Sequence, residues 1–237
     1  MYQVLSTKKL SPLLVARARE KGIHIIEQEF ISVRPLPLEA HKAEILSRLR
    51  PYTAIVFTSA HACEALTSFL NKAAVPGPLN GNVYCLSGKT RESLPSQLTA
   101  FVTDIADNAA SLAQKIVARG EKEVLFFCGN QRRDELPHIL KSAGIAVHEV
   151  VAYETTEVPS VALPDPDGVL FFSPSAVRSF FSANRLPAAA VCFAIGPTTA
   201  AAIGELTPNK VLTSEAPSQE MMLACVEFYF QNLNSLE

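Results

Sequence analysis

A set of short segments recurs once along this chain, in the same order and at a nearly constant separation. Each one reads as the end of a strand and the start of a helix. The matching pairs are 53–59 with 168–176, 83–90 with 191–198, and 101–103 with 211–213. A shared order at a constant offset indicates two copies of one domain. Two similar domains would also make a cleft between them, which is a common place for a small ligand.

A fourth repeated unit, which consists of two strands with a helix between them, explains the topology of the chain. Its second copy lies at the N-terminus rather than after residue 214. Its first strand, 124–129, matches 4–7, and its second strand, 144–149, matches 22–27. In both copies the helix between the two strands stops at a glycine, Gly144 or Gly22, where a left-handed C-cap is expected. The second copy is therefore completed by the start of the chain.

The repeat predicts two domains, one inserted into the other. The inserted α/β domain is expected at 35–155, and the discontinuous α/β domain at 1–34 plus 156–237. Because the chain must then cross between the domains twice, no flexible linker is needed.

The strands are predicted to be parallel and buried on both faces, because they are short apolar runs without alternation. The turns after them carry residues that cap helices, and the helices that follow are amphipathic. Apolar stripes run through Ala62, Leu66 and Phe69, and through Met222 and Val226. The predicted fold class is α/β, with two flavodoxin-like doubly wound parallel sheets of about five strands each.

Composition narrows the class of protein. Of the 237 residues, 48% are hydrophobic, and no apolar stretch approaches the ~20 residues of a membrane span. The net charge of −2, without blocks of like charge, argues against nucleic acid and membranes as partners. The five cysteines never form CxxC, which indicates reduced core residues rather than a metal site. Met1 leads straight into a predicted strand without a signal peptide, so we expect a cytoplasmic protein.

Ligands of open parallel sheets bind beyond the carboxyl ends of the strands, so the site is expected there. The turns at these ends carry no paired carboxylates, no Ser/His/Asp set, no HExxH and no GxGxxG. Segment 87–90 ends like a phosphate-binding loop but has Val83 where that loop needs glycine. The candidate binding residues at these ends are Thr58, Ser59, Lys89, Thr90, Cys128, Gly129, Arg132, Ser173, Ser175, Gly196, Thr198, Thr199 and Ser218.

Such turns offer backbone N–H groups at helix N-termini together with hydroxyl donors, which suits an anion. Each helix terminus contributes roughly 0.3–1 kcal/mol per anion contact. Positive charge would come from Lys89, Arg91, Arg132, Arg133 and Arg178. Two interpretations stay open at this point. Each Ser or Thr could serve only as an N-cap, and the arginine pair after Gly129 could belong to a solvated helix face.

The motifs in these turns resemble those of the uroporphyrinogen-III synthase family. Six pieces match in order over nearly the whole chain, and the Phe-Phe-Ser-Pro-Ser, Ile-Gly-Pro-Thr-Thr and Tyr-Glu-Thr pieces are the most specific. They are 57–62, 128–137, 151–155, 171–177, 194–200 and 215–218.

The resemblance implies two flavodoxin-like domains, one interrupted by the other and joined by a two-stranded ladder. It implies a cyclising hydro-lyase that converts the linear tetrapyrrole hydroxymethylbilane to uroporphyrinogen III in heme biosynthesis, with loss of water and inversion of ring D. No metal and no organic cofactor is implied. The expected partners are this small polycarboxylate substrate and, transiently, the deaminase that acts upstream. We expect a monomer.

The resemblance also assigns roles to single residues. Tyr153 matches the family's tyrosine at the domain junction, which implies that its phenol donates a proton to the leaving hydroxyl; packing against the ladder is the competing role. Thr90 and Thr198 match threonines that face the cleft, which implies binding and orientation. Ser87 departs from the pattern, since many members carry glycine there. For His61, in the first helix turn after Ser59, we expect a surface or capping role.

A competing function is a non-catalytic two-domain sensor that closes on an anionic small molecule. The same turns could bind the ligand of such a sensor. The sequence also lacks a strong set of acid–base residues that would argue against a sensor. Tyr153 and the lack of a recognisable effector segment favour the enzyme. A flavin-binding relative of flavodoxin is disfavoured, because no suitable phosphate loop opens the first domain and the chain has no tryptophan.

Overall fold

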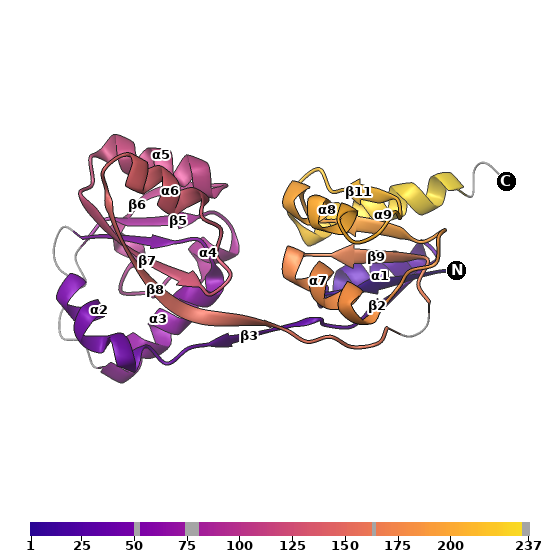
Figure 1. The fold of residues 1–237 in the computed structure, drawn as a ribbon, viewed down its shortest axis with the longest axis horizontal. Helices are drawn as coiled ribbons and strands as arrows, with labels where there is room; N and C mark the ends of the chain where they lie inside the picture. The colour runs from indigo at the N-terminus through magenta and orange to yellow at the C-terminus, as the bar shows by residue number, and fades with distance from the viewer. Residues whose placement is uncertain (50–52, 74–80, 163–164, 234–237) are drawn as a thin grey trace. The chain divides into compact units, whose positions relative to one another are not determined.

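The computed structural model describes residues 1–49, 53–73, 81–162 and 165–233. The chain divides into two compact units, shown in Figure 1. Unit 1 comprises Met1–Ser32 and Thr156–Glu237, and unit 2 comprises Val33–Thr155. Each unit is built around its own sheet.

Unit 1 holds a five-stranded parallel sheet. In order across the sheet its strands are β11 (Val211–Thr213), β10 (Val191–Ala194), β9 (Gly168–Phe171), β1 (Tyr2–Ser6) and β2 (Ile23–Glu27). Numbered along the chain, this order reads 2-1-3-4-5 from the β2 edge. The helices of the unit are α1 (Pro12–Glu20), α7 (Pro174–Ala183), α8 (Pro197–Gly204) and α9 (Gln219–Leu233).

Unit 2 holds the second sheet, in which five neighbouring strands are parallel. In order its strands are β3 (Ile31–Pro35), β8 (Ala146–Glu157), β7 (Glu123–Gly129), β4 (Ala54–Phe57), β5 (Val83–Leu86) and β6 (Val102–Ala106). Its helices are η1 (Leu38–His41), α2 (Lys42–Arg48), α3 (Ala60–Ala73), α4 (Lys89–Glu92), η2 (Thr99–Phe101), α5 (Ala109–Arg119) and α6 (Glu135–Ser142).

The two sheets match position for position, as the sequence repeat predicts. The order β6-β5-β4-β7-β8 in unit 2 corresponds to β11-β10-β9-β1-β2 in unit 1. The N-terminal strands β1 and β2 therefore occupy the places that β7 and β8 hold in the other copy. The predicted α/β class with two parallel-dominated sheets is confirmed.

One strand among the described residues was not counted by the sequence analysis. Strand β3 joins the unit 2 sheet beside β8 and brings it to six strands. The two strands run antiparallel, since Leu36 N donates to Ala152 O at 2.9 Å and Val158 N donates to Phe30 O at 2.9 Å. The side chains of β3 are exposed or half-buried. An edge strand of this kind lacks the apolar run by which the parallel strands were recognised.

Helix boundaries follow local capping. Ser11 Oγ accepts from Leu14 N at the start of α1, and Asn108 Oδ1 accepts from Ser111 N at the start of α5. As predicted, α1 and α6 end just before glycines with left-handed backbone, Gly22 at φ 75° and Gly144 at φ 78°.

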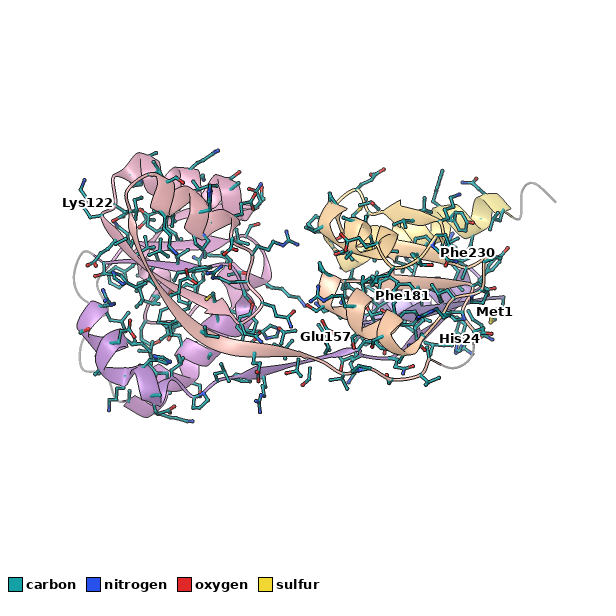
Figure 2. All side chains as sticks on the ribbon, viewed as in Figure 1. Met1, His24, Lys122, Glu157, Phe181 and Phe230 are labelled. Carbon is teal, nitrogen blue, oxygen red and sulfur yellow. The ribbon has the colours of Figure 1, made fainter. Side chains whose placement is uncertain are left out.

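Successive strand residues pack into clusters on opposite faces of each sheet. In β4, Ile55 and Phe57 pack with α3, whereas Ala54 and Val56 pack with α5 and α6. Figure 2 shows side chains filling both units and labels Phe181 and Phe230, which belong to two different clusters of unit 1. Burial on both faces explains why the central parallel strands, β4, β7, β9 and β10, read as continuous apolar runs.

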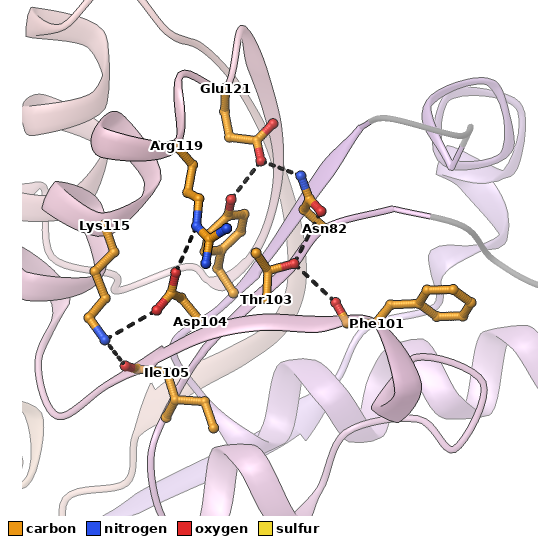
Figure 3. Close-up of polar contacts among 9 residues, drawn as sticks. Asn82, Phe101, Thr103, Asp104, Ile105, Lys115, Arg119 and Glu121 are labelled. Atoms are coloured by element: carbon orange, nitrogen blue, oxygen red, sulfur yellow. Dashed lines mark hydrogen bonds and ion pairs between the residues drawn. The ribbon is translucent and has the colours of Figure 1, made fainter.

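A polar network closes the N-terminal edge of the unit 2 sheet (Figure 3). The fully buried Tyr84 donates from its hydroxyl to Glu121 Oε1 at 2.6 Å, and Asn82 Nδ2 donates to the same oxygen at 2.6 Å. Beside it, Asp104 accepts from Lys115 Nζ at 3.3 Å and from Arg119 Nε at 3.1 Å. This network ties β5 and β6 to α5 and to the start of β7, at the edge opposite the predicted site.

Candidate active site

The predicted site residues lie at the C-terminal edge of each sheet. Cys128 and Gly129 end β7, Tyr153 lies in β8 opposite Gly129, and the others follow the parallel strands. In unit 2, from β8 across to β5, they are Tyr153, Cys128, Gly129, Thr58, Ser59, Lys89 and Thr90, with Arg132 in the loop after β7. In unit 1, they are Ser173 and Ser175 after β9, Gly196, Thr198 and Thr199 after β10, and Ser218 after β11. Each unit thus carries its own set.

The ring of Tyr153 lies directly against the backbone of Gly129. A Cβ added to Gly129 would stand 2.5 Å from both Cε2 and Cζ of the ring and 2.8 Å from the hydroxyl. No real Cβ tolerates such approaches, so any side chain at this position would push the phenol away. The absence of a side chain at Gly129 therefore provides the space in which this ring lies.

The backbone of Tyr153 is fixed by a local irregularity between β7 and β8. Cys128 pairs with Val151, but Gly129 pairs with Tyr153, so one residue of β8 is passed over. Such bulges re-aim the side chains beside them. Asn130 completes the arrangement: its backbone N–H donates to Tyr153 O at 3.2 Å, and its Oδ1 accepts from Thr155 N at 2.8 Å.

The phenol of Tyr153 is held in its protonated form. Burial raises its pKa above the usual range, and a hydrogen bond from the Ser59 hydroxyl only partly opposes this. The nearby thiol of Cys128 adds to the rise. At neutral pH the side chain is therefore a proton or hydrogen-bond donor rather than a phenolate.

The imidazole of His61 lies beside this phenol. The two ring centroids are 5.5 Å apart, with 54° between the ring planes. His61 Nδ1 lies 3.3 Å from Glu64 Oε2, one helical turn further along α3. The expectation of a surface role is correct in that the side chain is exposed, but it does not foresee the contact with Tyr153.

Thr90 and Lys89 begin α4 and differ in exposure. Lys89 is exposed, whereas Thr90 is buried and its carbonyl oxygen lies 3.5 Å from Cys63 Sγ of α3. The preceding Gly88 has φ 63°, a left-handed backbone conformation that glycine adopts readily. This turn therefore anchors Thr90 between β5 and α3.

Two predicted binding residues are committed to contacts inside the protein. Burial raises the pKa of the Cys128 thiol to about 11, so this thiol is uncharged at neutral pH. The Arg132 guanidinium donates to Glu149 of β8 and to Asp134. Its charge is thus already balanced by two carboxylates, one of which also lies 3.3 Å from Lys141 Nζ. The sequence left two roles open for Arg132, anion binding and a solvated helix face. Neither of them included the ion pair with Glu149.

In unit 1, two predicted serines act as helix N-caps. Ser173 Oγ accepts from Ala176 N at 3.2 Å at the start of α7, and Ser218 Oγ accepts from Met221 N at 3.1 Å at the start of α9. Each hydroxyl keeps its proton available for donation to a ligand, because capping uses only an oxygen lone pair. A cap role and a binding role are therefore compatible. Ser175, the second residue of α7, is almost entirely buried.

The start of α8, like that of α4, has no side-chain cap. Its N-cap is Gly196, which has no side chain to occupy the first N–H groups, and Pro197 follows at the first helical position. Thr198 is exposed, whereas Thr199 is buried. A helix N-terminus without a side-chain cap leaves N–H donors for an anion.

Two hollows lie within the single units. One lies between α5 and α6, lined in part by Val117, His138 and Ile139, and another lies beside α1. Among residues 1–49, 53–73, 81–162 and 165–233, no three His, Cys, Asp or Glu side chains gather as metal ligands would. Within the same ranges, no helix combines the length and apolar character needed to cross a membrane.

Sequence reasoning missed two residues that shape this site, His61 and Asn130. Asn130 stood in the Cys-Gly-Asn piece of the resemblance, but its bonds to β8 depend on the bulge. The signal for His61 was its place in the turn after Ser59. The contact with Tyr153 is formed between neighbouring parts of the sheet edge and leaves no pattern along the chain.

Comparison with known proteins adds an independent observation. A family model described as "Uroporphyrinogen-III synthase HemD" matches residues 13–224. The uroporphyrinogen-III synthase of Saccharomyces cerevisiae is 28% identical over 211 residues, which cover 74% of this chain and 75% of the yeast protein. The porphyrin biosynthesis protein HemD of Ruminiclostridium josui is 23% identical over 239 residues, and the match covers 92% of this chain but 46% of that protein.

Among solved structures, the uroporphyrinogen-III synthetase of Helicobacter pylori is similar with a TM-score of 0.65 at 21% identity. The similarity covers 98% of this chain and 99% of that one, and at this identity it speaks for the fold. These comparisons give no support to the two-domain sensor that the sequence left as an alternative.

Proposed function

Because the chain belongs to the uroporphyrinogen-III synthase family, we propose that it cyclises hydroxymethylbilane to uroporphyrinogen III, with loss of water and inversion of ring D. It is a cyclising lyase of heme biosynthesis that acts on a tetrapyrrole. The observation that carries the proposal is the family match over residues 13–224. The protonated phenol of Tyr153 at the sheet edge supplies a chemical group that the reaction needs.

The substrate is a polycarboxylate, and the turns of both units suit one. Backbone N–H groups at helix N-termini and hydroxyl donors bind anions without a dense cluster of fixed charge. The binding residues that we propose are Thr58, Ser59, Lys89, Thr90, Cys128, Gly129, Arg132, Ser173, Ser175, Gly196, Thr198, Thr199 and Ser218. Among them, Gly129 acts by leaving room, and Cys128 and Arg132 act by supporting β8 and the loop that precedes α6.

Tyr153 is the proposed proton donor. The C–O bond of the terminal hydroxymethyl group breaks, its electron pair stays with the oxygen, and the phenol proton turns that oxygen into water. The pyrrole that loses the oxygen becomes an azafulvene cation. This cation attacks the substituted carbon of ring D, and the spiro intermediate then fragments and recloses. The proton released from a pyrrole carbon at closure returns to the phenolate.

Positioning supplies the rest of the catalysis. Unguided closure uses the free ring position and gives the type I isomer, so the protein must hold the rings in a folded pose. Thr90 and Thr198 are proposed to orient the substrate, one from each unit. No cofactor is proposed, since loss of hydroxide needs only a proton donor and a protein that holds the resulting azafulvene cation in position.

The remaining parts of the proposal concern organisation. The two units are proposed to act as domains, close to the predicted boundaries 1–34 plus 156–237 and 35–155. We propose a cytoplasmic monomer that binds neither nucleic acid nor membranes and contacts the upstream deaminase transiently.

Product analysis tests the proposal. The protein is mixed with freshly generated hydroxymethylbilane, the products are oxidised, and type I and type III uroporphyrins are separated by chromatography. We expect type III to predominate and to scale with protein added. Type I alone, at the level of a control without protein, would remove the synthase activity from this chain.

A further inference from the structure

The proposed chemistry leaves one side chain at the edge of unit 2 without a role. His61 is linked to Tyr153 by a direct ring contact and through Ser59. Its ring centroid lies 5.5 Å from that of Tyr153, and its backbone N–H donates to Ser59 Oγ at 3.3 Å. The same serine hydroxyl acts to lower the pKa of the Tyr153 phenol. A direct ring contact and a shared serine therefore link His61 to the proposed proton donor.

The imidazole is oriented from the side away from Tyr153. Glu64 Oε2 lies 3.3 Å from His61 Nδ1, and because a carboxylate can only accept, Nδ1 is the donor in this contact. Nε2 is then the ring nitrogen at which protons exchange. The side chain of His61 is 51% exposed, so this exchange can take place with water.

A neighbouring positive charge would make the Tyr153 phenol a better proton donor. Burial raises the pKa of its phenol, which keeps the proton in place but also makes the phenol a weaker acid. When the phenol gives up its proton, negative charge develops on the oxygen of a half-buried side chain. A cation close to the ring would stabilise this charge.

We propose that His61 is a positioning residue that acts through Tyr153, with its imidazolium stabilising the phenolate formed during proton transfer. This inference rests on the role of Tyr153 in the proposed function. The covalent step is unchanged: the proton moves from the phenol to the leaving oxygen and returns to the phenol at ring closure. His61 gains and loses no proton in the cycle.

The groups facing this pair set the expected pH dependence. Cys128 on β7 faces Tyr153, and its thiol is neutral because burial raises its pKa to about 11. Glu64 on α3 faces His61. Only a charged imidazole can stabilise the phenolate in this way, and an imidazole loses its charge as pH rises. Turnover should therefore fall with rising pH in the wild type.

Three variants and a matched control test the proposal through kcat and KM from pH 6 to 9. His61→Phe keeps a ring beside Tyr153 but removes the charge, so we expect kcat at pH 6.5 to drop about fivefold to tenfold, with KM nearly unchanged and without the pH step. His61→Lys keeps a charge to higher pH and should extend activity there. Glu64→Gln should keep the contact between the two rings, but the imidazole should be held less firmly without the carboxylate. His41→Phe is the control, since His41 also pairs with a glutamate three residues on but is not among the residues of the proposed site.

A second readout needs no substrate. In protein labelled with 13C at the tyrosine ζ-carbon, Tyr153→Phe identifies the Tyr153 signal. In the wild type this signal should show an inflection as the charge of the imidazole changes with pH, and His61→Phe should abolish that inflection. A missing inflection, or the same kcat profile in wild type and His61→Phe, overturns the proposal. If the wild type makes no type III isomer, the proposed function fails instead, and the inflection still reports whether the two side chains are coupled.

Discussion

Gly129 and Tyr153 are fitted to each other: the tyrosine ring occupies the volume where a side chain at position 129 would begin. A Cβ there would lie 2.5 Å from Cε2 and Cζ of the ring. The pairing of these two residues across β7 and β8 depends on the bulge after Cys128. Space at Gly129 is thus a condition for the position of the proposed proton donor.

Gly129→Ala should therefore damage catalysis more than folding. The added methyl must displace the phenol, and overpacking of this kind costs about 1–3 kcal/mol. We expect kcat for type III formation to fall at least about tenfold, since small misplacements of a reacting group are costly. Gly204→Ala is the matched control, because nothing lies within 4 Å of its added Cβ. Wild-type kcat in Gly129→Ala would refute this account of the glycine.

Glu121→Ala should destabilise the protein without changing its chemistry. The substitution leaves the hydroxyl of the fully buried Tyr84 without the carboxylate that accepts from it at 2.6 Å. An unpaired buried polar group costs about 1–3 kcal/mol. Urea unfolding should report a loss of this size, whereas Tyr84→Phe combined with Glu121→Ala should cost less than the sum of the two single variants. Additive losses would show that the two residues are uncoupled.

The stability contributed by Asp104 should depend on pH. Partial burial acts to raise the pKa of this carboxyl, but the hydrogen bonds and charges of Lys115 and Arg119 outweigh it and hold the pKa below its usual value. The contribution is therefore present above the unfolded pKa of aspartate, about 3.9, and is lost as pH falls through the lower folded value. Asp104→Asn should cost up to about 1 kcal/mol at pH 7. Urea unfolding of wild type and variant should converge at low pH; a constant difference would contradict the assignment.

Ser173 should show two separable roles. Ser173→Ala removes the cap of α7 and should cost about 0.5–2 kcal/mol of unfolding free energy. Ser173→Asp keeps an acceptor for Ala176 N, so thermal unfolding should stay near that of the wild type. Its negative charge should nevertheless repel a polycarboxylate and raise KM. If KM is unchanged in Ser173→Asp, Ser173 is only a cap.

Much of the fold follows from local patterns. The apolar runs of the parallel strands, the glycines that end α1 and α6, and the order of the repeated turns are all readable along the chain. They predict two parallel sheets whose strands correspond in order. Strand β3 could not be predicted in this way, because an exposed edge strand has no buried face and therefore shows no apolar pattern in its sequence.

The contacts within the candidate site could not be predicted from the sequence. Which side chains meet there depends on strand register: the bulge brings Tyr153 opposite Gly129, and the pairing of β7 with β8 brings Glu149 within reach of Arg132. His61 and Tyr153 are far apart in sequence and lie at the edge of one sheet. Such contacts form only when the sheet is assembled, so no spacing of residues along the chain predicts them.

The most direct test of the account compares wild type with Tyr153→Phe by the yield of each uroporphyrin isomer from hydroxymethylbilane. Circular dichroism and thermal unfolding first establish that the variant folds. The account predicts mainly type III from the wild type, and in the variant a turnover lower by at least about tenfold, with type I from unguided closure making up the remainder. Type III formation by Tyr153→Phe at the wild-type rate would contradict the central claim that this phenol supplies the proton.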